Sequence, residues 1–503
     1  MLAVRNKCPE QIGSFVTTKL FRPRTFVLEP NSNKSVPIGT IACVREYLTK
    51  LGFDDLFDNS KSKGHPLFQL VCAIISYRLT ENFSVEGCGR WLESSEVRNE
   101  LGIRSEVSHR AINRAVERCG EIMPEVLSHL RKALFSMYDL EHTDVNIDTT
   151  SVAVYAKGTG LYDFGYSRDK RPDLRQVNFG AAELRDPINI PIDLSVDRGN
   201  ASDSVQFVKI VDDIIGDLRD DSLFVFDAGG DAKQVLDRIT EKGHRYITRK
   251  RMNKSDDLWI SKFDRDEAVC VDVNDGVYCQ RKMFESSGRT VYLFYSEKLY
   301  RDKMAALDGR SWRCVEDAKD VMRRKRDGTL RVSKTVIKRL KNPLISLNVG
   351  VQGKLLQNDL DSFEYVREHL SNRREGFFKL ECSSNLTAGE VFSIYRRRDT
   401  VEKLMDSLKN HIDLKPMRVW SESSVKGTLL LCFLAQVIVS MVRYEIPELR
   451  KSSTKFIIDS LQNLTVTYVY DRKQAVRRVY SNFEALNSRI LRDIVVVSGV
   501  SGG

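Results

Sequence analysis

The chain has 503 residues, of which 42% are hydrophobic and 29% charged, and its formal net charge is +10. These proportions fit a soluble globular protein of about two to four domains. They exclude a membrane protein, because the most apolar stretch, 427–442, is too short to span a bilayer and is predicted to be a buried core helix. Ten scattered cysteines form no C-x-x-C pair, and the N-terminus lacks the apolar region of a signal peptide. We therefore expect a reduced, cytoplasmic chain without structural zinc.

Residues 1–140 are predicted to be mostly helical and to bind DNA. Ser108 is expected to cap a helix that presents Arg110, Arg114 and Arg118 in a row. Such a row is typical of a DNA-reading helix and equally of an ordinary arginine-rich surface. The sequence leaves both interpretations open.

Residues 141–250 change to an α/β pattern. Segments 144–155 and 188–196 are rich in β-branched residues, which indicates strands. A helix, a strand, a second helix and a further strand follow at 202–218, 222–227, 232–243 and 245–250. Strands followed by alternating helices and strands predict a mixed α/β sheet.

Residues 251–375 interrupt this alternation and are predicted to be a β-rich, basic insertion. Three strands are expected at 268–273, 276–284 and 290–296. A basic run follows at 317–342, and its densest part is Arg323, Arg324, Lys325 and Arg326. Contacts to the phosphate backbone of DNA need only cations. The run therefore indicates either a DNA contact or a solvated basic helix.

Residues 376–450 return to the α/β pattern, and 451–503 are assigned to a C-terminal region. A strand is predicted at 376–384. One long helix is predicted after it, because Thr387 and Glu390 have the spacing of a capping box and Pro416 lies just beyond the expected end.

Four polar residues of this predicted helix share one stripe: Tyr395, Arg398, Glu402 and Lys409. At about 100° per residue they fall within about 60° of one another. A core-facing stripe is expected to contain Ile394, Val401, Leu404, Met405, Leu408 and Ile412. Glu402 would then lie on the seam between core and solvent, beside a phenol and two cations. An ordinary amphipathic helix with i,i+4 charge pairs has the same periodicity, so the stripe needs partners elsewhere.

Two strand acids are candidate partners. Asp148 lies between apolar residues of the strand at 144–155, and Asp227 ends the strand at 222–227. Ligand sites of open α/β sheets form at the carboxyl ends of strands. Each acid alone is compatible with the capping of a turn, but two such acids with a seam glutamate form a rarer combination.

Three clustered carboxylates repel one another, which divalent cations relieve. Hard oxygen ligands suit Mg²⁺ or Mn²⁺. Two such ions about 3.5–4 Å apart activate the attacking oxygen and stabilise the leaving oxygen in phosphodiester chemistry.

With these residues the chain resembles the DDE transposases of prokaryotic insertion sequences, and within them the group with a Y-R-E-K signature. The three acids of the DDE set correspond to Asp148, Asp227 and Glu402. The signature corresponds to Tyr395-x2-Arg398-x3-Glu402-x6-Lys409. Segment 165–177 resembles the stretch after the first acid, and 414–435 the stretch after the signature lysine. One departure is Ala228, where many relatives have an arginine.

The resemblance implies an RNase H-like core over 141–250 and 376–450, divided by the insertion. It implies that the three acids bind two Mg²⁺ or Mn²⁺ ions, that water cuts the element's end, and that the freed 3′-OH attacks target DNA. Tyr395, Arg398 and Lys409 would hold phosphates of the element's end. A homodimer on double-stranded DNA is expected because two ends must be paired.

Some relatives form a DNA hairpin and stack a flipped base on an aromatic of the insertion, where this chain has Trp259 and Trp312. The sequence does not choose between them, and core packing is an alternative for each. Two other functions remain as alternatives to an active transposase. One is a catalytically silent or repurposed DNA-binding protein, and the other is an RNase H-like repair nuclease.

Overall fold

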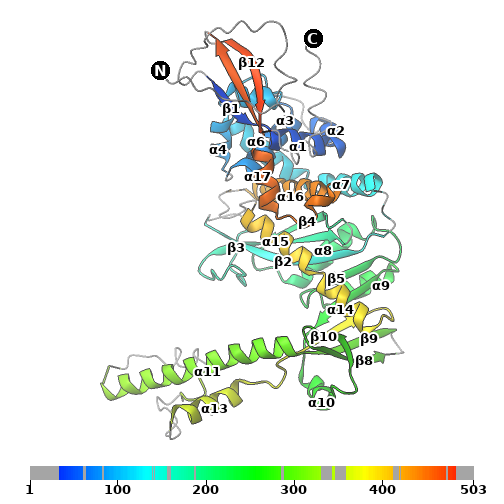
Figure 1. Ribbon diagram of the computed structural model, residues 1–503, viewed down its shortest axis with the longest axis vertical. Coiled ribbons are helices and arrows are strands. Elements are labelled where there is room, and N and C mark those ends of the chain that lie inside the picture. The colour runs from blue at the N-terminus through cyan, green and yellow to red at the C-terminus, as the bar shows by residue number, and fades with distance from the viewer. Residues whose placement is uncertain are drawn as a thin grey trace, which may run out of the picture.

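The computed structural model is elongated, with the N-terminal helices at one end, a large sheet in the middle and a helical arm at the other end (Figure 1). It describes residues 33–482 except for 60–63, 82–83, 139, 141, 156–159, 186–187, 285–287, 330–341, 346–357, 412–418, 420 and 472–473.

The N-terminal region is helical, as predicted. Its helices are α1 (Gly39–Lys50), α2 (Phe53–Asn59), α3 (Leu67–Thr80), α4 (Val85–Trp91), α5 (Ser95–Glu100), α6 (His109–Glu121) and α7 (Met123–Tyr138). The side chain of Ser108 accepts a hydrogen bond from the Ala111 amide and caps α6, as expected. Arg110 and Arg114 of α6 are exposed, whereas Ile112 and Val116 are buried.

The C-terminal segment returns to this helical region, which the sequence did not indicate. Strands β11 (Thr465–Asp471) and β12 (Gln474–Ser481) pair with the short N-terminal strand β1 (Lys34–Pro37) in an antiparallel sheet. Helix α17 (Thr454–Gln462) precedes them and contacts α1 and α3. The described C-terminal residues are therefore part of the N-terminal lobe.

A nine-stranded sheet forms the centre of the molecule, in the order β4-β3-β2-β5-β6-β10-β9-β8-β7. Its first five strands are β2 (Val145–Val154), β3 (Arg175–Leu184), β4 (Pro191–Arg198), β5 (Leu223–Phe226) and β6 (Arg245–Lys250). The pairs β2–β5 and β5–β6 are parallel, and the pairs β2–β3 and β3–β4 are antiparallel. With α8 (Asp203–Ile214) and α9 (Lys233–Glu241) these strands form an RNase H-like core.

The insertion extends the same sheet. The three predicted strands are present as β7 (Val269–Asp272), β8 (Val277–Phe284) and β9 (Arg289–Ser296), and β9 pairs with β10 (Phe377–Cys382) next to β6. The short helix α10 (Asp257–Ser261) precedes them. The rest of the described insertion is helical: α11 (Glu297–Arg326) and α13 (Asp359–Leu370) form an arm that projects from the sheet (Figure 1).

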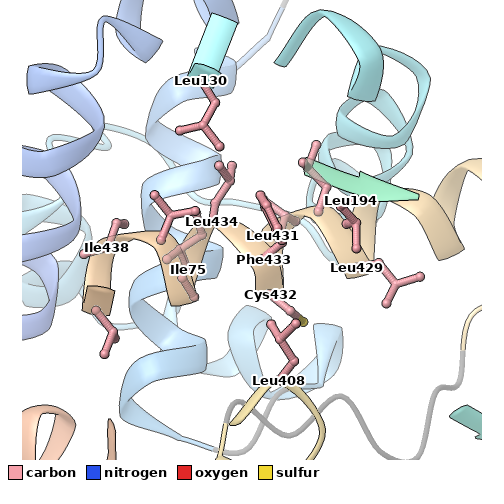
Figure 2. Close-up of a cluster of buried hydrophobic side chains, with 14 of the residues drawn as sticks. Ile75, Leu130, Leu194, Leu408, Leu429, Leu431, Cys432, Phe433, Leu434 and Ile438 are labelled. Carbon is pink, nitrogen blue, oxygen red and sulfur yellow. The ribbon is translucent and has the colours of Figure 1, made fainter. Parts of the chain in front are cut away.

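Helix α16 (Glu422–Glu445) is the buried core helix that the apolar stretch predicted, and it is longer than that stretch. By length and composition alone it could cross a membrane, but 94% of its most apolar window is buried inside the protein. Figure 2 shows its leucines and Phe433 among Ile75 of α3, Leu130 of α7, Leu194 of β4 and Leu408. The helix therefore fills the space between the N-terminal helices and the sheet.

Two glycines allow α6 and α16 to approach closely. A Cβ on Gly427 would lie 1.8 Å from the carbonyl oxygen of Val116, and a Cβ on Gly120 would lie 1.9 Å from that of Ser423. Both obstacles are helix backbone, which cannot move aside as a flexible side chain can. The crossing of these helices thus requires glycine at both positions.

A buried ion cluster also joins the two regions. Arg131 of α7 lies 2.7 Å from the carboxylate of Asp193 on β4 and 2.6 Å from that of Asp217. Burial raises the pKa of Asp193 to about 7, although Arg131 opposes that shift. Loss of one partner from such a buried pair leaves an uncompensated charge, so Arg131 fixes α7 against the sheet.

We predict that Gly427→Ala lowers the free energy of unfolding by about 1–3 kcal/mol, because the added methyl group forces the two helix backbones apart. Urea unfolding followed by circular dichroism measures this. Gly389→Ala is the matched control, since a Cβ there meets nothing within 4 Å, and it should not destabilise the protein. Equal effects of the two substitutions on the free energy of unfolding would show that the close approach of α6 and α16 does not require glycine at position 427.

Candidate functional site

The two strand acids lie side by side, Asp148 within the first half of β2 and Asp227 directly after the end of β5. In the parallel pair, Ile147 is opposite Phe226, and the next residue on each strand is Asp148 and Asp227, respectively. Adjacent strands are about 4.8 Å apart. The register of the sheet thus brings together two acids that are 79 positions apart in the sequence.

The single long helix predicted after Thr387 is wrong. The capping box of Thr387 and Glu390 is present, but it begins α14 (Ala388–Arg396), which ends at Arg397. A second helix, α15 (Asp399–Asp406), follows and continues as a π-helical turn, η4 (Ser407–His411). Helix α14 contacts β5 to β8, whereas α15 contacts β2 and β3 (Figure 1). The break lets each helix pack on its own part of a twisted sheet.

The core-facing stripe is largely present despite the break. Val401, Leu404, Met405 and Leu408 are buried, and Ile394 is half-buried. Ile412 and Pro416 lie outside the described residues. Glu402 lies on the seam, as expected, with 55% of its side chain exposed.

Two of the four signature residues contact the strand acids, and a third, Glu402, pairs with one of those two. Tyr395 donates a hydrogen bond of 3.4 Å from its hydroxyl to Oδ1 of Asp227. Arg398 forms an ion pair with Glu402, and its Nη1 lies 3.9 Å from Oδ1 of Asp148. The guanidinium also lies 5.6 Å from the centre of the Tyr395 ring. The three acids therefore converge on the pair formed by Tyr395 and Arg398.

Electrostatics couples these groups. Burial raises the pKa of Asp148, and the nearby Arg398 limits this increase. Burial alone would lower the pKa of Arg398, but Tyr395 and the three acids together raise it. Burial and the negative charge of Asp227 raise the pKa of Tyr395 to about 12. The guanidinium is thus a positive charge enclosed by the acids, and it compensates their mutual repulsion.

Lys409 lies at a different place from the other three signature residues. It belongs to the π-helical turn η4, its side chain is 10% exposed, and its Nζ lies 3.2 Å from Oδ1 of Asp169. The other oxygen of Asp169 accepts a hydrogen bond from the Ala153 amide of β2. Lys409 therefore holds the segment that connects β2 to β3.

That connecting segment is fixed by charge pairs that the sequence did not specify. Arg168 donates to Oγ1 of Thr149, one residue after Asp148, and to Oδ1 of Asp203 at the start of α8. Arg171 pairs with Asp173 in the same segment. Sequence reasoning missed the pairing of Asp169 with Lys409, because their 240-residue separation has no local pattern.

Helix α15 is anchored to the sheet by Thr400. Its hydroxyl donates a 2.7 Å hydrogen bond to Oε2 of the buried Glu183 on β3 and accepts one of 3.1 Å from the amide of Asn146 on β2. Thr400 lies two residues before Glu402. The anchor thus sets the position of the third acid relative to the strand that carries Asp148.

The donor set of the three acids suits a hard divalent cation. The guanidinium of Arg398 already places one positive charge among the acids. The buried Nη1 of Arg398 makes no hydrogen bond within the described residues. In the described parts of the chain, however, no three acidic, histidine or cysteine side chains are close enough together to hold a metal ion. Oxygen ligands are present, but Arg398 takes the place of a cation among them.

The basic cluster of the insertion is remote from the acids. Arg323, Arg324, Lys325 and Arg326 form the exposed last turn of α11, and Asp320 pairs with the first two. Figure 1 shows this end of α11 at the tip of the arm, away from α14 and α15. Residues 330–341 of the basic run lie outside the described residues.

The two tryptophans of the insertion differ in their surroundings. Trp312 is 42% exposed and stacks on Phe363 of the arm, with ring centres 4.6 Å apart. Trp259 of α10 is half-buried and lines a cavity of about 760 Å³. The backbone amide of Ala228 donates a hydrogen bond of 2.7 Å to Oδ1 of Asp227.

We predict that Thr400→Val lowers the free energy of unfolding by about 1–3 kcal/mol, because it removes a hydrogen-bond partner from buried Glu183. Thermal denaturation measures this effect. Thr400→Ser keeps the hydroxyl and should retain most of the stability. If valine is tolerated as well as serine, the hydrogen bond does not anchor α15.

Comparisons with known proteins address the class of the chain. No curated protein sequence matches it. Among solved structures, the piggyBac transposase synaptic complex with hairpin DNA is similar, with a TM-score of 0.39 and 9% identity over 92% of this chain and 82% of that chain. The family model described as Transposase DDE domain matches residues 145–438, from the start of β2 into α16. Because this match spans more than half of the 503 residues, the chain belongs to the DDE transposase family.

Proposed function

We propose that this protein is an active DNA transposase of a prokaryotic insertion sequence, from the group with the Y-R-E-K signature. It cuts the ends of its own element and joins the freed 3′-OH ends to target DNA. The convergence of Asp148, Asp227 and Glu402 on Arg398 supports the proposal, because clustered acids of this kind have no evident packing role. Family membership supports the reaction class.

In this proposal Asp148, Asp227 and Glu402 hold two Mg²⁺ or Mn²⁺ ions. When bound, such ions activate the attacking oxygen and stabilise the leaving oxygen of a phosphodiester. Glu402 is the most exposed of the three acids: its side chain is 55% exposed and that of Asp148 22%, while Asp227 is half-buried. It is therefore the acid that moves most easily, while the strand register keeps Asp148 and Asp227 in place.

Arg398 acts as the counterion of the acids before metal binds. Its guanidinium is buried, so it lowers the repulsion among carboxylates without strong screening by water. Released from the acids, Arg398 would bind a phosphate of the element's end. Tyr395 and Lys409 bind neighbouring phosphates, and Lys409 exchanges its contact with Asp169 for one with DNA.

Other parts of the chain extend the DNA interface. The exposed Arg110 and Arg114 of α6 contact DNA from the N-terminal lobe, and the cluster Arg323–Arg326 contacts backbone phosphates at the tip of the arm. The protein works as a homodimer on DNA, because two element ends are paired. It acts in the cytoplasm, at the nucleoid.

Two alternatives make different predictions. A silent or repurposed DNA-binding protein would bind the flanks of its gene without cutting them. A repair nuclease of the RNase H-like class would cut DNA without preference for those flanks. Mapping of cut ends after incubation of the protein with its flanking DNA and Mg²⁺ separates all three.

We predict that Asp148→Asn, Asp227→Asn and Glu402→Gln each reduce strand cutting to background and leave DNA binding intact. Each substitution removes one negative ligand but keeps its shape. The measurement is gel mapping of labelled flanking DNA with Mg²⁺, with EDTA as the condition that stops cutting.

Asp399→Asn is the matched control for these variants. Asp399 lies on the same helix as Glu402, but its side chain is 52% exposed and pairs with Lys403. This control should cut at the normal rate. Normal cutting by any one of the three acid variants would remove that residue from the proposed site.

We also predict that Lys409→Ala weakens binding to the element's end. It should reduce the slope of log binding constant against log salt concentration by about one unit, which corresponds to one lost phosphate contact. Fluorescence anisotropy over a salt series measures the slope. Lys403→Ala is the control, because Lys403 is exposed on α15 and pairs with Asp399. An unchanged slope for Lys409→Ala would exclude the phosphate contact.

A further inference from the structure

A cavity of about 760 Å³ lies in the insertion and is lined mainly by cations. We call it the cationic cavity. Its lining has two acids, Asp256 and Glu381, and Trp259 forms part of its wall. Six basic residues line it: Lys250, Lys262, Arg281, Lys282, Arg289 and Lys379.

The sheet register explains how these cations gather. Strand β10 lies between β6 and β9. Its Lys379 is opposite Lys250 of β6, and its Glu381 is opposite Val291 of β9. Val291 is in turn opposite Lys282 of β8. Directly opposed residues and every second residue along a strand share one face of a sheet. Four adjacent strands therefore present their lysines, with Arg289, on the same face.

The two acids of the cationic cavity are already engaged. Asp256 lies 2.8 Å from the Nζ of Lys379 through both of its oxygens. Glu381 lies 3.5 Å from Lys250 and 3.8 Å from Arg289, and it accepts a hydrogen bond from Tyr246. Among the described residues, no ion pair with an acid is formed by the remaining cations Lys262, Arg281 and Lys282. The cavity thus has an excess of positive charge.

The cationic cavity begins close to the acid site. Phe226 of β5 is opposite Thr248 of β6. Asp227 is the next residue after Phe226, and Lys250 comes two residues after Thr248. Strand geometry places the two Cα atoms roughly 5 Å apart across the strands and about 3 Å along them. Asp227 and Lys250 point to opposite faces of the sheet. A DNA strand that crosses the carboxyl edge of the sheet at Asp227 therefore reaches the rim of the cavity.

We propose that the cationic cavity binds backbone phosphates of the DNA strand that runs past the acid site. This inference rests on the proposed function, since DNA at Asp227 brings the phosphates within reach. Lys282 and Arg289 are exposed and make the contacts at the rim. The site is separate from the signature residues, which lie on the other face of the sheet with α14 and α15.

The first test measures the salt dependence of binding to a duplex from the element's end, by anisotropy without metal so that no cutting occurs. Lys282→Ala and Arg289→Ala should each reduce the slope of log binding constant against log salt by roughly 0.9, and the double variant by roughly twice that. Lys242→Ala is the matched control, because Lys242 is exposed just before the opposite end of β6 and should leave the slope unchanged. Unchanged slopes in the double variant would overturn the proposal.

The second test uses the fluorescence of Trp259, assigned by comparison with Trp259→Phe. Addition of the duplex should change this signal in the wild type, and inorganic phosphate should do so only at far higher concentration. If inorganic phosphate and the duplex change the Trp259 fluorescence equally at the same total phosphate concentration, the cavity binds free anions. That result would overturn the proposed DNA contact. Neither readout depends on strand cutting, so loss of cutting in the acid variants tests the proposed function separately.

Discussion

Repulsion among three carboxylates is the constraint on which the site depends. The sheet register brings Asp148 and Asp227 together, and α15 adds Glu402. Without a positive charge among them, at least one of these acids would lose its proton only well above its ordinary pKa. The buried guanidinium of Arg398 supplies that charge, and the acids in turn make its burial tolerable.

The surrounding structure holds these charged side chains in fixed positions relative to one another. Thr400 joins α15 to two strands, and Asp169 joins η4 to the segment after β2. Behind them, α16 packs against both the sheet and the N-terminal helices. The contact of Gly120 and Gly427, together with the ion cluster of Arg131, attaches those helices firmly. A DNA-reading surface on α6 would thus have a fixed position relative to the acids.

The insertion changes what the sheet can do. Because β10 joins β9 to β6, the three strands of the insertion, β7, β8 and β9, continue the core sheet and do not form a separate layer. One face of the extension packs under α14, and the other presents the cationic cavity. The same edge of one sheet therefore carries the acids on one side and an excess of cations on the other. The arm of α11 and α13 begins where β9 ends.

The class of the fold and most strands could be predicted from the sequence, which also singled out Asp148, Asp227 and Glu402 as candidate acids. Periodicity and capping depend on residues that are neighbours in the sequence. The helix N-caps Thr387 and Ser108 and the strands of the insertion could therefore be predicted. Strand β3 was not singled out, because its centre, Asn178–Glu183, has few β-branched residues. Four features could be recognised only in three dimensions: the break before α15, the burial of Arg398 among the acids, the pairing of Lys409 with Asp169 and the cationic cavity. These depend on sheet twist and strand register, which join residues up to hundreds of positions apart and therefore have no local signal.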